Sequence, residues 1–312
     1  MRIQTVLKKA VEDFTNPRFL LPFLAVFFLI GLLFTAGFST GLPSGLSDLP
    51  LMIQERELTK AFTQLTFLWY AGIPIMILIA IISANQIAKE EEEGSLRILL
   101  SKPVRRWEVI LGKFLAIMVF SFLIVLTGLS LGSILLFHVS GASSSALGGS
   151  VITLMSTNLV YALFLSFFIS SIATGISVLT GSRLKTAMAV VTVFVLLFFG
   201  FIIIRMGTEP MGIYQDYGLY SADINYNLGN SYIFIHNSLG GEFAPPTQSS
   251  LSTIMGTFDA SGADVDPLVG GMPTSLPKKG YIPPAASFAG ILLISIGALS
   301  ATTFYFERKD IM

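Results

Sequence analysis

The stretch "ISANQIAKEEEEGSLRILLSKPVRRWEVILGKF" covers residues 82–114 and separates two strongly hydrophobic segments. Ten charged residues fall between Lys89 and Glu108, in a chain of 312 residues with only 19 basic and 19 acidic side chains. The chain is 53% hydrophobic and 12% charged, whereas about 25% of the residues of a soluble domain are charged. This deficit indicates an integral membrane protein, in which the quoted stretch is a polar loop between two spans.

Six segments are long and apolar enough to cross a membrane, since a spanning helix needs roughly 20 mostly apolar residues. They are residues 19–37, 65–84, 113–137, 151–180, 186–204 and 284–306. Away from their outermost ends, none of them contains Asp, Glu, Lys, Arg or His. The sequence therefore predicts an all-α integral membrane protein with six transmembrane helices.

The orientation follows from the lysines and arginines of the loops, which are more frequent on the cytoplasmic side. With a cytoplasmic N-terminus, 14 basic residues lie inside and 5 lie outside. The inside residues are Arg2, Lys8, Lys9, Arg18, Lys89, Arg97, Lys102, Arg105, Arg106, Lys113, Arg183, Lys185, Arg308 and Lys309. The outside residues are Arg56, Lys60, Arg205, Lys278 and Lys279. Both termini and the loop 85–112 are therefore predicted to be cytoplasmic.

The chain divides into three parts on this topology. Residues 1–205 are predicted to form spans 1–5, and residues 284–312 form span 6 with a cytoplasmic tail. Residues 206–283 are predicted to form an extracytoplasmic domain. This segment carries seven acidic side chains against two lysines, so it offers an acidic surface to an extracytoplasmic protein partner.

The N-terminal residues 2–14 are predicted to form an amphipathic helix. One face carries Ile3, Val6, Leu7, Ala10, Val11 and Phe14, and the other carries Lys8, Lys9, Glu12 and Asp13. A helix of this kind lies in the membrane interface with its lysines towards anionic lipid headgroups. The alternative is a cytoplasmic helix that packs on a partner.

Small residues recur at helical spacing in two spans. Gly128 and Gly132 form a G-x-x-x-G pattern in span 3, and Ser166, Ser170 and Thr174 follow one face of span 4. Small residues allow helices to approach closely in membranes. We interpret both sets as packing surfaces rather than substrate contacts.

The loop 85–112 itself divides at Gly94, which permits a sharp change of direction. Before Gly94, we interpret the four glutamates as a solvated helical extension of span 2, with Glu93 at i,i+4 spacing from both Lys89 and Arg97. After Gly94, Ser95 is a favourable N-cap, and the helix that it begins has Leu96, Leu99 and Leu100 on one face.

Pro103 ends this short helix at Lys102. Arg105, Arg106 and Trp107 then have the composition of a membrane interface, where basic groups meet headgroups and indoles sit at the boundary. The loop is therefore predicted to hold a short amphipathic helix parallel to the membrane, whose leucines contact either a protein groove or the lipid interface.

Most enzymatic functions lack the residues that they need. The sequence contains no G-x-x-x-x-G-K-[ST] phosphate loop, no H-E-x-x-H pattern and no cysteine, and its only histidines are His138 and His236. We therefore expect no metal ion and no cofactor in this chain. A formal net charge of zero also argues against nucleic-acid binding.

Two alternative functions are a CAAX-processing membrane protease and an ion-coupled secondary carrier. Residues 92–97 satisfy the E-E-x-x-x-R pattern of CAAX-processing membrane proteases, but neither histidine has the companion residues of that family, and both lie outside or at the boundary on the predicted topology. An ion-coupled secondary carrier generally needs ionisable groups inside its spans or spans broken by Gly and Pro. The sequence predicts neither feature, but an ATP-independent carrier that binds sodium through the backbone carbonyls of broken helices stays an alternative.

The loop resembles a known signature. The segment "EEEEGSLRILLSKPVRRWEVILGKF" is similar to the pattern E-x-G-[ST]-L…LL-[ST]-x-P-[VI]-x-R-x-x-[IV]-[LIV]-x-G-K of ABC-2 type permeases, the membrane subunits of type V ABC exporters. The terminal "FERKDIM" is similar to the F-x-R-[RK]-D-[IL] ending of the unfused permease branch. The six spans and the N-terminal helix agree with this family, whereas the segment 206–283 is longer than in its simple members.

The resemblance implies that the short helix is a coupling helix, which docks in a groove of a separate cytoplasmic P-loop ATPase. The docking residues that it implies are Glu93, Gly94, Ser95, Leu96, Arg97, Leu99, Leu100, Ser101, Lys102, Pro103 and Arg106. ATP and magnesium would then bind the partner subunit, and a second permease copy would complete a homodimer or heterodimer. The family implies an exporter in the plasma membrane, and the uncharged spans suggest an amphipathic or hydrophobic substrate such as a peptide, a lipid or a drug-like molecule.

Overall fold

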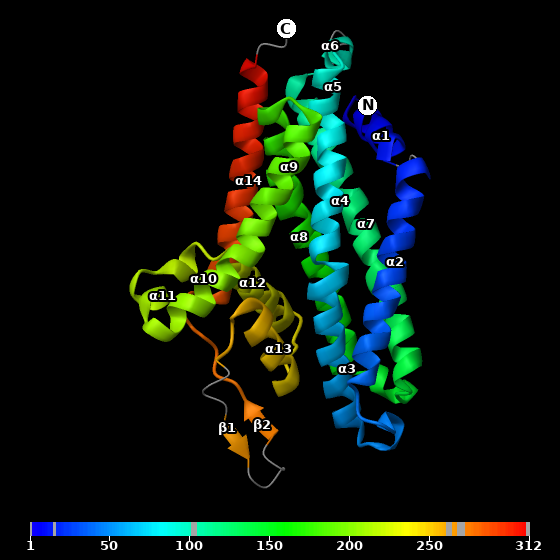
Figure 1. Cartoon of the computed structure of the whole chain (residues 1–312), viewed down its shortest axis with the longest axis vertical. Helices are drawn as coiled ribbons and strands as arrows, with labels where there is room; N and C mark the ends of the chain where they lie inside the picture. Colours follow the sequence, from blue (N-terminus) through cyan, green and yellow to red (C-terminus); the bar gives the residue numbers. More distant parts are fainter. Residues whose placement is uncertain (1, 15–16, 101–104, 260–263, 267–271, 310–312) are drawn as a thin grey trace.

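The computed structural model describes residues 2–14, 17–100, 105–259, 264–266 and 272–309, which are mostly helical (Figure 1). The α-helices are α1 Arg2–Phe14, α2 Pro17–Thr40, α3 Leu51–Leu65, α4 Ile73–Ser83, α5 Lys89–Glu92, α6 Ser95–Leu100, α7 Arg106–Ser140, α8 Ser150–Thr180, α9 Arg183–Val195, α10 Phe201–Thr208, α11 Ile213–Asp216, α12 Ile224–Ser238, α13 Pro245–Met255 and α14 Pro284–Arg308. The π-helical turns are η2 Thr66–Tyr70, η3 Ala84–Ala88 and η5 Leu196–Gly200. Short 3-10 turns are η1 Leu46–Asp48, η4 Ser144–Leu147, η6 Glu209–Met211 and η7 Leu219–Ser221.

The six predicted spans are confirmed as six helical runs of sufficient length and hydropathy to cross a membrane. They are Leu20–Thr40, Leu51–Glu92, Arg106–Ser140, Ser150–Thr180, Arg183–Met211 and Pro284–Arg308. The second run is much longer than its apolar part, because α3 precedes the span and α5 extends beyond it. The chain is therefore a multi-pass membrane protein.

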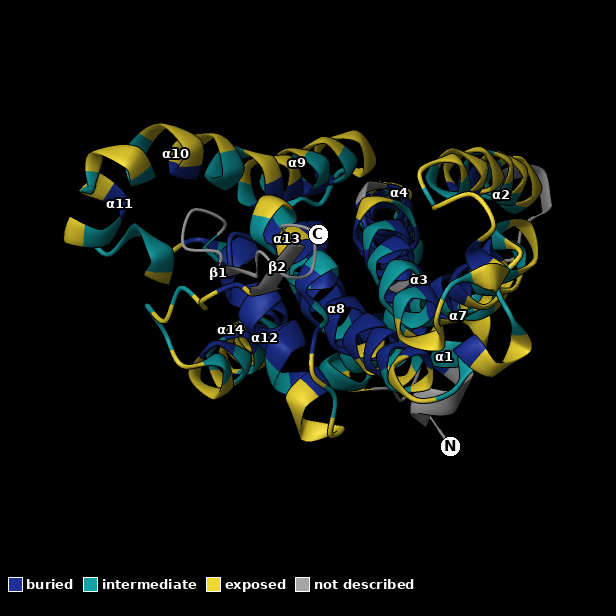
Figure 2. Cartoon of the chain, turned by 90° about the horizontal axis from the view of Figure 1, so that it is seen from below, coloured by how far each residue is buried: buried dark blue, intermediate teal, exposed yellow. Residues whose placement is uncertain are grey.

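The helices form a bundle whose centre consists of span 2, α7 and α8 (Figure 2). Spans 1, 5 and 6 lie around this centre and are mostly exposed along their apolar length. Exposed apolar helices are stable only where lipid covers them, and all their backbone groups are paired within the helix. This arrangement places the buried contacts along span 2, which leads to the quoted loop.

Span 2 is broken halfway along its length, contrary to the expectation of uninterrupted spans. The π-turn η2 ends at Tyr70, and the next helix, α4, begins at Ile73 with Pro74 in its first turn. A Cβ atom on Gly72 would lie 2.4 Å from the carbonyl oxygen of Phe67, so only glycine fits the break. Span 5 carries a π-turn of its own, η5. The sequence did not predict the break in span 2 or the π-turn in span 5, because π-turns have no distinct sequence pattern. The one Gly-Pro interruption, "AGIP" in span 2, is a weak signal by itself.

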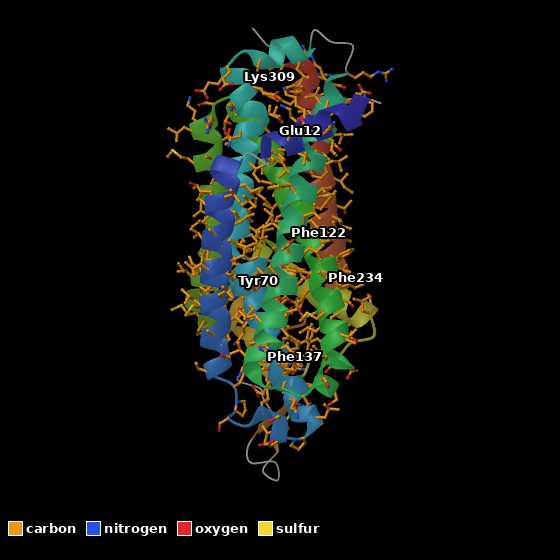
Figure 3. All side chains as sticks on the ribbon, turned by 90° about the vertical axis from the view of Figure 1, so that its right-hand side faces the viewer. Glu12, Tyr70, Phe122, Phe137, Phe234 and Lys309 are labelled. Atoms are coloured by element: carbon orange, nitrogen blue, oxygen red, sulfur yellow. The ribbon has the colours of Figure 1, made fainter. Side chains whose placement is uncertain are left out.

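The G-x-x-x-G pattern of span 3 is confirmed as a packing surface, and it receives the ring of Tyr70. Cβ atoms on Gly128 and Gly132 would lie 2.7 Å from Tyr70 Cδ1 and 2.3 Å from Tyr70 Cε2. Tyr70 lies about halfway along the bundle, beside α2 and α7 (Figure 3). The two glycines therefore let the residue at the break of span 2 enter the surface of span 3.

The hydroxyl face of span 4 is also a packing surface, as predicted. Ser166, Ser170 and Thr174 are all buried. One turn further on, Ser177 Oγ donates to Ser83 O at 2.8 Å and accepts from the amide of Ala88 at 3.2 Å. These two bonds connect α8 to both ends of the π-turn η3.

The N-terminal helix α1 packs on the protein itself. Val6, Ala10 and Phe14 are buried, and the Phe14 ring lies 5.3 Å from that of Phe120 in α7. The apolar face of α1 is thus turned towards the bundle rather than towards lipid, because α7 offers a complementary apolar surface. Lys8 and Lys9 are exposed, and their contact with headgroups stays a prediction. The side chain of Ile3 lies outside the described residues.

The segment 206–283 shares its core with the bundle. Within it, α12 is buried almost all round and lies between α8 and α14, while α13 lies against α3. Two short strands, β1 Asp264–Asp266 and β2 Met272–Ser275, pair antiparallel. Among its described residues, Leu228, Ile233 and Leu251 join the main apolar cluster of the spans, so this segment packs on the bundle. Its extracytoplasmic location stays a prediction.

Candidate functional site

Residues 89–100 form a sharp corner at one end of the bundle (Figure 1). Helix α5 ends at Glu92, and α6 begins at Ser95. Gly94 has a left-handed φ of 74°, a conformation that glycine adopts without steric cost. Ser95 Oγ donates to the carbonyl of Glu90 at 3.3 Å and holds the corner closed.

Helix α6 is anchored to the bundle by Leu96. This side chain has no exposed surface and packs with the buried residues Ile87, Ile110, Val178 and Phe306. Leu99 packs on the same cluster and is half-buried. Since these residues come from η3, α7, α8 and α14, α6 is attached to the ends of spans 2, 3, 4 and 6. Leu96 is therefore an anchor within the chain and has no surface to offer a partner.

Arg106 is the second predicted docking residue with an internal role. Its guanidinium donates to the carbonyls of Phe306 at 3.1 Å, Glu307 at 3.1 Å and Lys309 at 2.7 Å. These carbonyls at the end of α14 have no partners within the helix, and a cation at a helix C-terminus is favourable. Arg106 thus joins the beginning of span 3 to the end of span 6.

The remaining predicted docking residues have different positions. Glu93 is exposed, and its carboxylate lies 3.9 Å from Lys89 Nζ, which confirms the predicted i,i+4 pair. Ser101, Lys102 and Pro103 lie outside the described residues, as do the side chains of Arg97 and Leu100.

The prediction that the glutamates form a solvated extension is wrong for Glu90 and Glu91. Their side chains are only 13% and 20% exposed. Consecutive residues of a helix point about 100° apart, so neighbouring glutamates meet different helices. We call Glu90, Glu91 and Glu92 the glutamate hub.

Glu90 forms ion pairs with residues of α7 and α1. It pairs with Lys113, whose side chain is 3% exposed in α7, and its other oxygen lies 3.6 Å from Lys9 in α1. Lys113 Nζ also donates to the carbonyl of Gln86 at 2.6 Å. Removing one partner of a buried ion pair typically costs about 3–5 kcal/mol, so Lys113 fixes α5 firmly to span 3.

Glu91 and Glu92 contact the residue that follows α14 and the beginning of α9. Glu91 Oε1 lies 2.6 Å from Nζ of Lys309, which also donates to the carbonyl of Val178 at 2.8 Å. Glu92 accepts the amide N–H of Arg183 at 2.8 Å, where α9 begins and where a helix N-terminus favours an acidic group. The hub therefore connects α5 to α1, α7, α9 and the end of span 6.

The family profile described as "ABC-2 family transporter protein" matches residues 4–311. The chain belongs to the ABC-2 transporter family. Members of this family are membrane permeases of ABC-type transport and not the ATPase itself, so membership implies an ATPase partner. None of the curated proteins compared with the chain matches it.

Two buried polar groups away from the α5–α6 corner were missed by sequence reasoning. Arg205 is 4% exposed at the end of span 5, and its Nη1 lies 3.2 Å from Asp223 Oδ2. Asp223 also accepts from Tyr214 Oη at 2.8 Å and from the amide of Tyr226 at 3.0 Å, where it caps α12. The sequence feature that points to this ion pair is Arg205 itself, which interrupts the apolar run "FIIIRMG".

The second missed group is His236 in α12. It is buried, lies 2.8 Å from the hydroxyl of Thr157 and stacks on Phe243 with ring centroids 3.9 Å apart. Burial lowers the pKa of His236 to about 4, so this histidine is neutral at pH 7. It lies in α12, whereas Glu92 lies at the α5–α6 corner (Figure 1), so the groups of a CAAX-type protease are not brought together.

Proposed function

We propose that this chain is the permease subunit of an ABC exporter in the plasma membrane, with α6 as the element that docks a separate cytoplasmic P-loop ATPase. ATP and magnesium bind that partner, and two permease copies form the transport pathway. The cargo is an amphipathic or hydrophobic molecule. The observation that carries this proposal is the attachment of α6 to the ends of spans 2, 3, 4 and 6 through Leu96.

The physical argument concerns how motion reaches the spans. A ligand shifts a conformational equilibrium only by differential contacts with its two states. α6 is six residues long and is separated from the hub by Glu93 and Gly94 alone. An ATPase that displaces α6 therefore acts on α1, α7, α9 and span 6 through contacts that are already formed.

The internal contacts of Leu96 and Arg106 bear on which residues should be substituted to test docking. Leu96 and Arg106 maintain the corner, so their substitution is expected to destabilise the permease itself. Leu100 is the better test of docking, and Leu100→Asp is expected to abolish stimulation of ATP hydrolysis while the permease still inserts. As a matched control, Leu184→Asp introduces the same charge at a position that is 70% exposed on α9. Equal stimulation by both variants would contradict the assignment of α6.

An ATP-independent secondary carrier is a second candidate, because the interruptions of spans 2 and 5 are a feature of such carriers. The two candidates differ in what accompanies the permease. Gentle detergent extraction followed by identification of co-purifying chains is expected to recover a P-loop ATPase at equal stoichiometry. Recovery of the permease alone, with uptake that follows an ion gradient, would support the carrier and contradict the exporter.

A further inference from the structure

The end of the bundle opposite α6 contains a cavity of about 560 Å³ between α3 and α13. Pockets that hold small molecules typically have volumes of about 300–1,000 Å³. One wall is a single helical face of α3 and the following turn η2, with Ile53, Glu57, Lys60, Gln64 and Leu68 at spacings of three and four residues. This face becomes apolar towards the membrane span.

The polar part of the cavity carries an excess of positive charge. Lys60 Nζ lies 3.7 Å from Glu57 Oε2, so these two charges largely offset each other. Arg56 also lines the cavity and is half-buried. Among the residues that the structure describes, its guanidinium has no hydrogen-bond or ion-pair partner. A half-buried arginine without a partner favours an anionic group, which it can bind with two parallel hydrogen bonds.

A second cavity of about 100 Å³ adjoins the apolar part of the first, and Leu68 and Ile254 belong to the walls of both. Its other walls include Phe67 in η2, Phe198 and Phe199 in η5, and Tyr161. The π-turns of spans 2 and 5 thus line one space, as expected for irregular backbone within a membrane protein. The Tyr161 hydroxyl is buried and has no partner in the described part of the chain.

The walls of the two cavities extend along the helix axis far enough for a head and a tail. From Arg56 to Leu68, α3 and η2 rise by about 18 Å at roughly 1.5 Å per residue. An amphiphile with its head at Arg56 would place its tail beside Leu68 and Ile254, and an ester or hydroxyl oxygen on it would give Tyr161 a partner.

We propose that these adjoining cavities bind an amphiphile with a phosphate or carboxylate head and an acyl or alkyl tail. Arg56 binds the head, and the second cavity, which is lined by Phe67, Phe198 and Phe199, receives the tail. This inference rests on the proposed function, since it names the substrate class of the exporter. On the predicted topology, the head lies at the extracytoplasmic side.

The test uses the purified permease in a neutral detergent. The probe is dodecyl phosphate with a photoreactive diazirine at the end of its tail, compared with the corresponding dodecyltrimethylammonium probe. We expect the phosphate probe to label the walls near Leu68, Ile254 and Phe199, and to be displaced by unlabelled dodecyl phosphate. The cationic probe should label these residues about tenfold less, since a charge-assisted contact is worth about one tenfold step in affinity.

Two variants separate the site from general charge effects. Arg56→Gln should reduce labelling by the phosphate probe about tenfold. Lys185→Gln removes the same charge from an exposed position at the other end of the bundle and should leave labelling unchanged. Equal labelling by both probes, equal labelling in both variants, or labelling confined to the exposed surfaces of α2 and α14 would each overturn the proposal.

The same experiment distinguishes this inference from the proposed function, since it requires no ATPase. A permease that co-purifies with an ATPase but is not labelled would overturn the substrate class alone. A permease that is labelled but recovered without an ATPase would leave the site in place and overturn the exporter.

Discussion

The Nζ atom of Lys309 lies 2.6 Å from Glu91 Oε1, although these residues are 218 positions apart in the chain. The contact joins the end of span 2 to the residue that follows span 6 (Lys309 is labelled in Figure 3). Only Glu93 and Gly94 separate α5 from α6. A displacement of α6 therefore acts directly on this ion pair.

Reversing the charge of Glu91 is expected to uncouple the permease. Glu91→Lys places two cations together and should lower the free energy of unfolding by about 1–3 kcal/mol, between the values for exposed and buried pairs. Stimulation of ATP hydrolysis should fall as well, because span 6 is no longer held to α5. Thermal unfolding and ATPase assays measure the two effects separately.

The control for this prediction is the exchanged pair. Glu91→Lys combined with Lys309→Glu restores opposite charges and should recover most of the lost stability and stimulation. A double variant that is no better than either single variant would show that the ion pair does not carry the effect.

Gly128 and Gly132 of span 3 form a notch that receives the ring of Tyr70. This notch gives a prediction about packing. In Gly132→Ala the new Cβ would lie 2.3 Å from Tyr70 Cε2, so the ring or the helices must move. Overpacking of this kind typically costs about 1–3 kcal/mol, which a lowered unfolding temperature would detect. Because Tyr70 lies at the break of span 2, transport should also be impaired.

Gly37→Ala in α2 is the matched control, since its Cβ would meet no atom within 4 Å. Alanine favours a helix by about 0.5–1 kcal/mol over glycine, so this variant should be as stable as the unaltered protein or more so. If both glycine variants behaved alike, the notch would have no role in packing.

The buried histidine predicts a loss of stability in acid. Burial holds the pKa of His236 at about 4, below the roughly 6.5 of an unfolded chain. The unfolded state therefore binds more protons, and stability falls as the pH decreases from about 6.5 towards 4. For this group the loss at pH 5 is about 2 kcal/mol relative to pH 7.

Measuring the free energy of unfolding between pH 7 and pH 5 tests whether stability falls in acid and whether His236 causes the fall. His236→Gln keeps a polar side chain beside Thr157 and should flatten the pH dependence, at the cost of some stability at pH 7. An unaltered slope in this variant would assign the acid sensitivity to other groups.

The predictable part of the structure depends on residues that are close in the sequence. Hydropathy located all six spans because a spanning helix satisfies its own backbone groups, whatever its neighbours are. Gly94 predicted the corner between α5 and α6, since a left-handed backbone position is a local requirement. The notch of Gly128 and Gly132 was predicted as a surface, but its occupant, Tyr70, was not.

The unpredicted part depends on partners that are distant in the sequence. The glutamates appeared solvated because their cations lie at positions 9, 113 and 309. Leu96 was expected to face a partner, but four other elements of the chain cover it. Helix α12 had no readable pattern, because a helix that is buried all round has no polar face.

Attachment of a cross-linker to the α5–α6 corner tests the central claim most directly. The chain has no cysteine, so Glu93→Cys, at an exposed position of the corner, introduces the only thiol for a photoreactive label. Tyr217→Cys, at a position that is 77% exposed, places the same label beyond the far end of span 5, away from the α5–α6 corner. Illumination of native membranes should join the Glu93→Cys variant, but not the Tyr217→Cys variant, to a P-loop ATPase subunit. An ATPase adduct with the Tyr217→Cys variant alone, or with neither variant, would contradict the account.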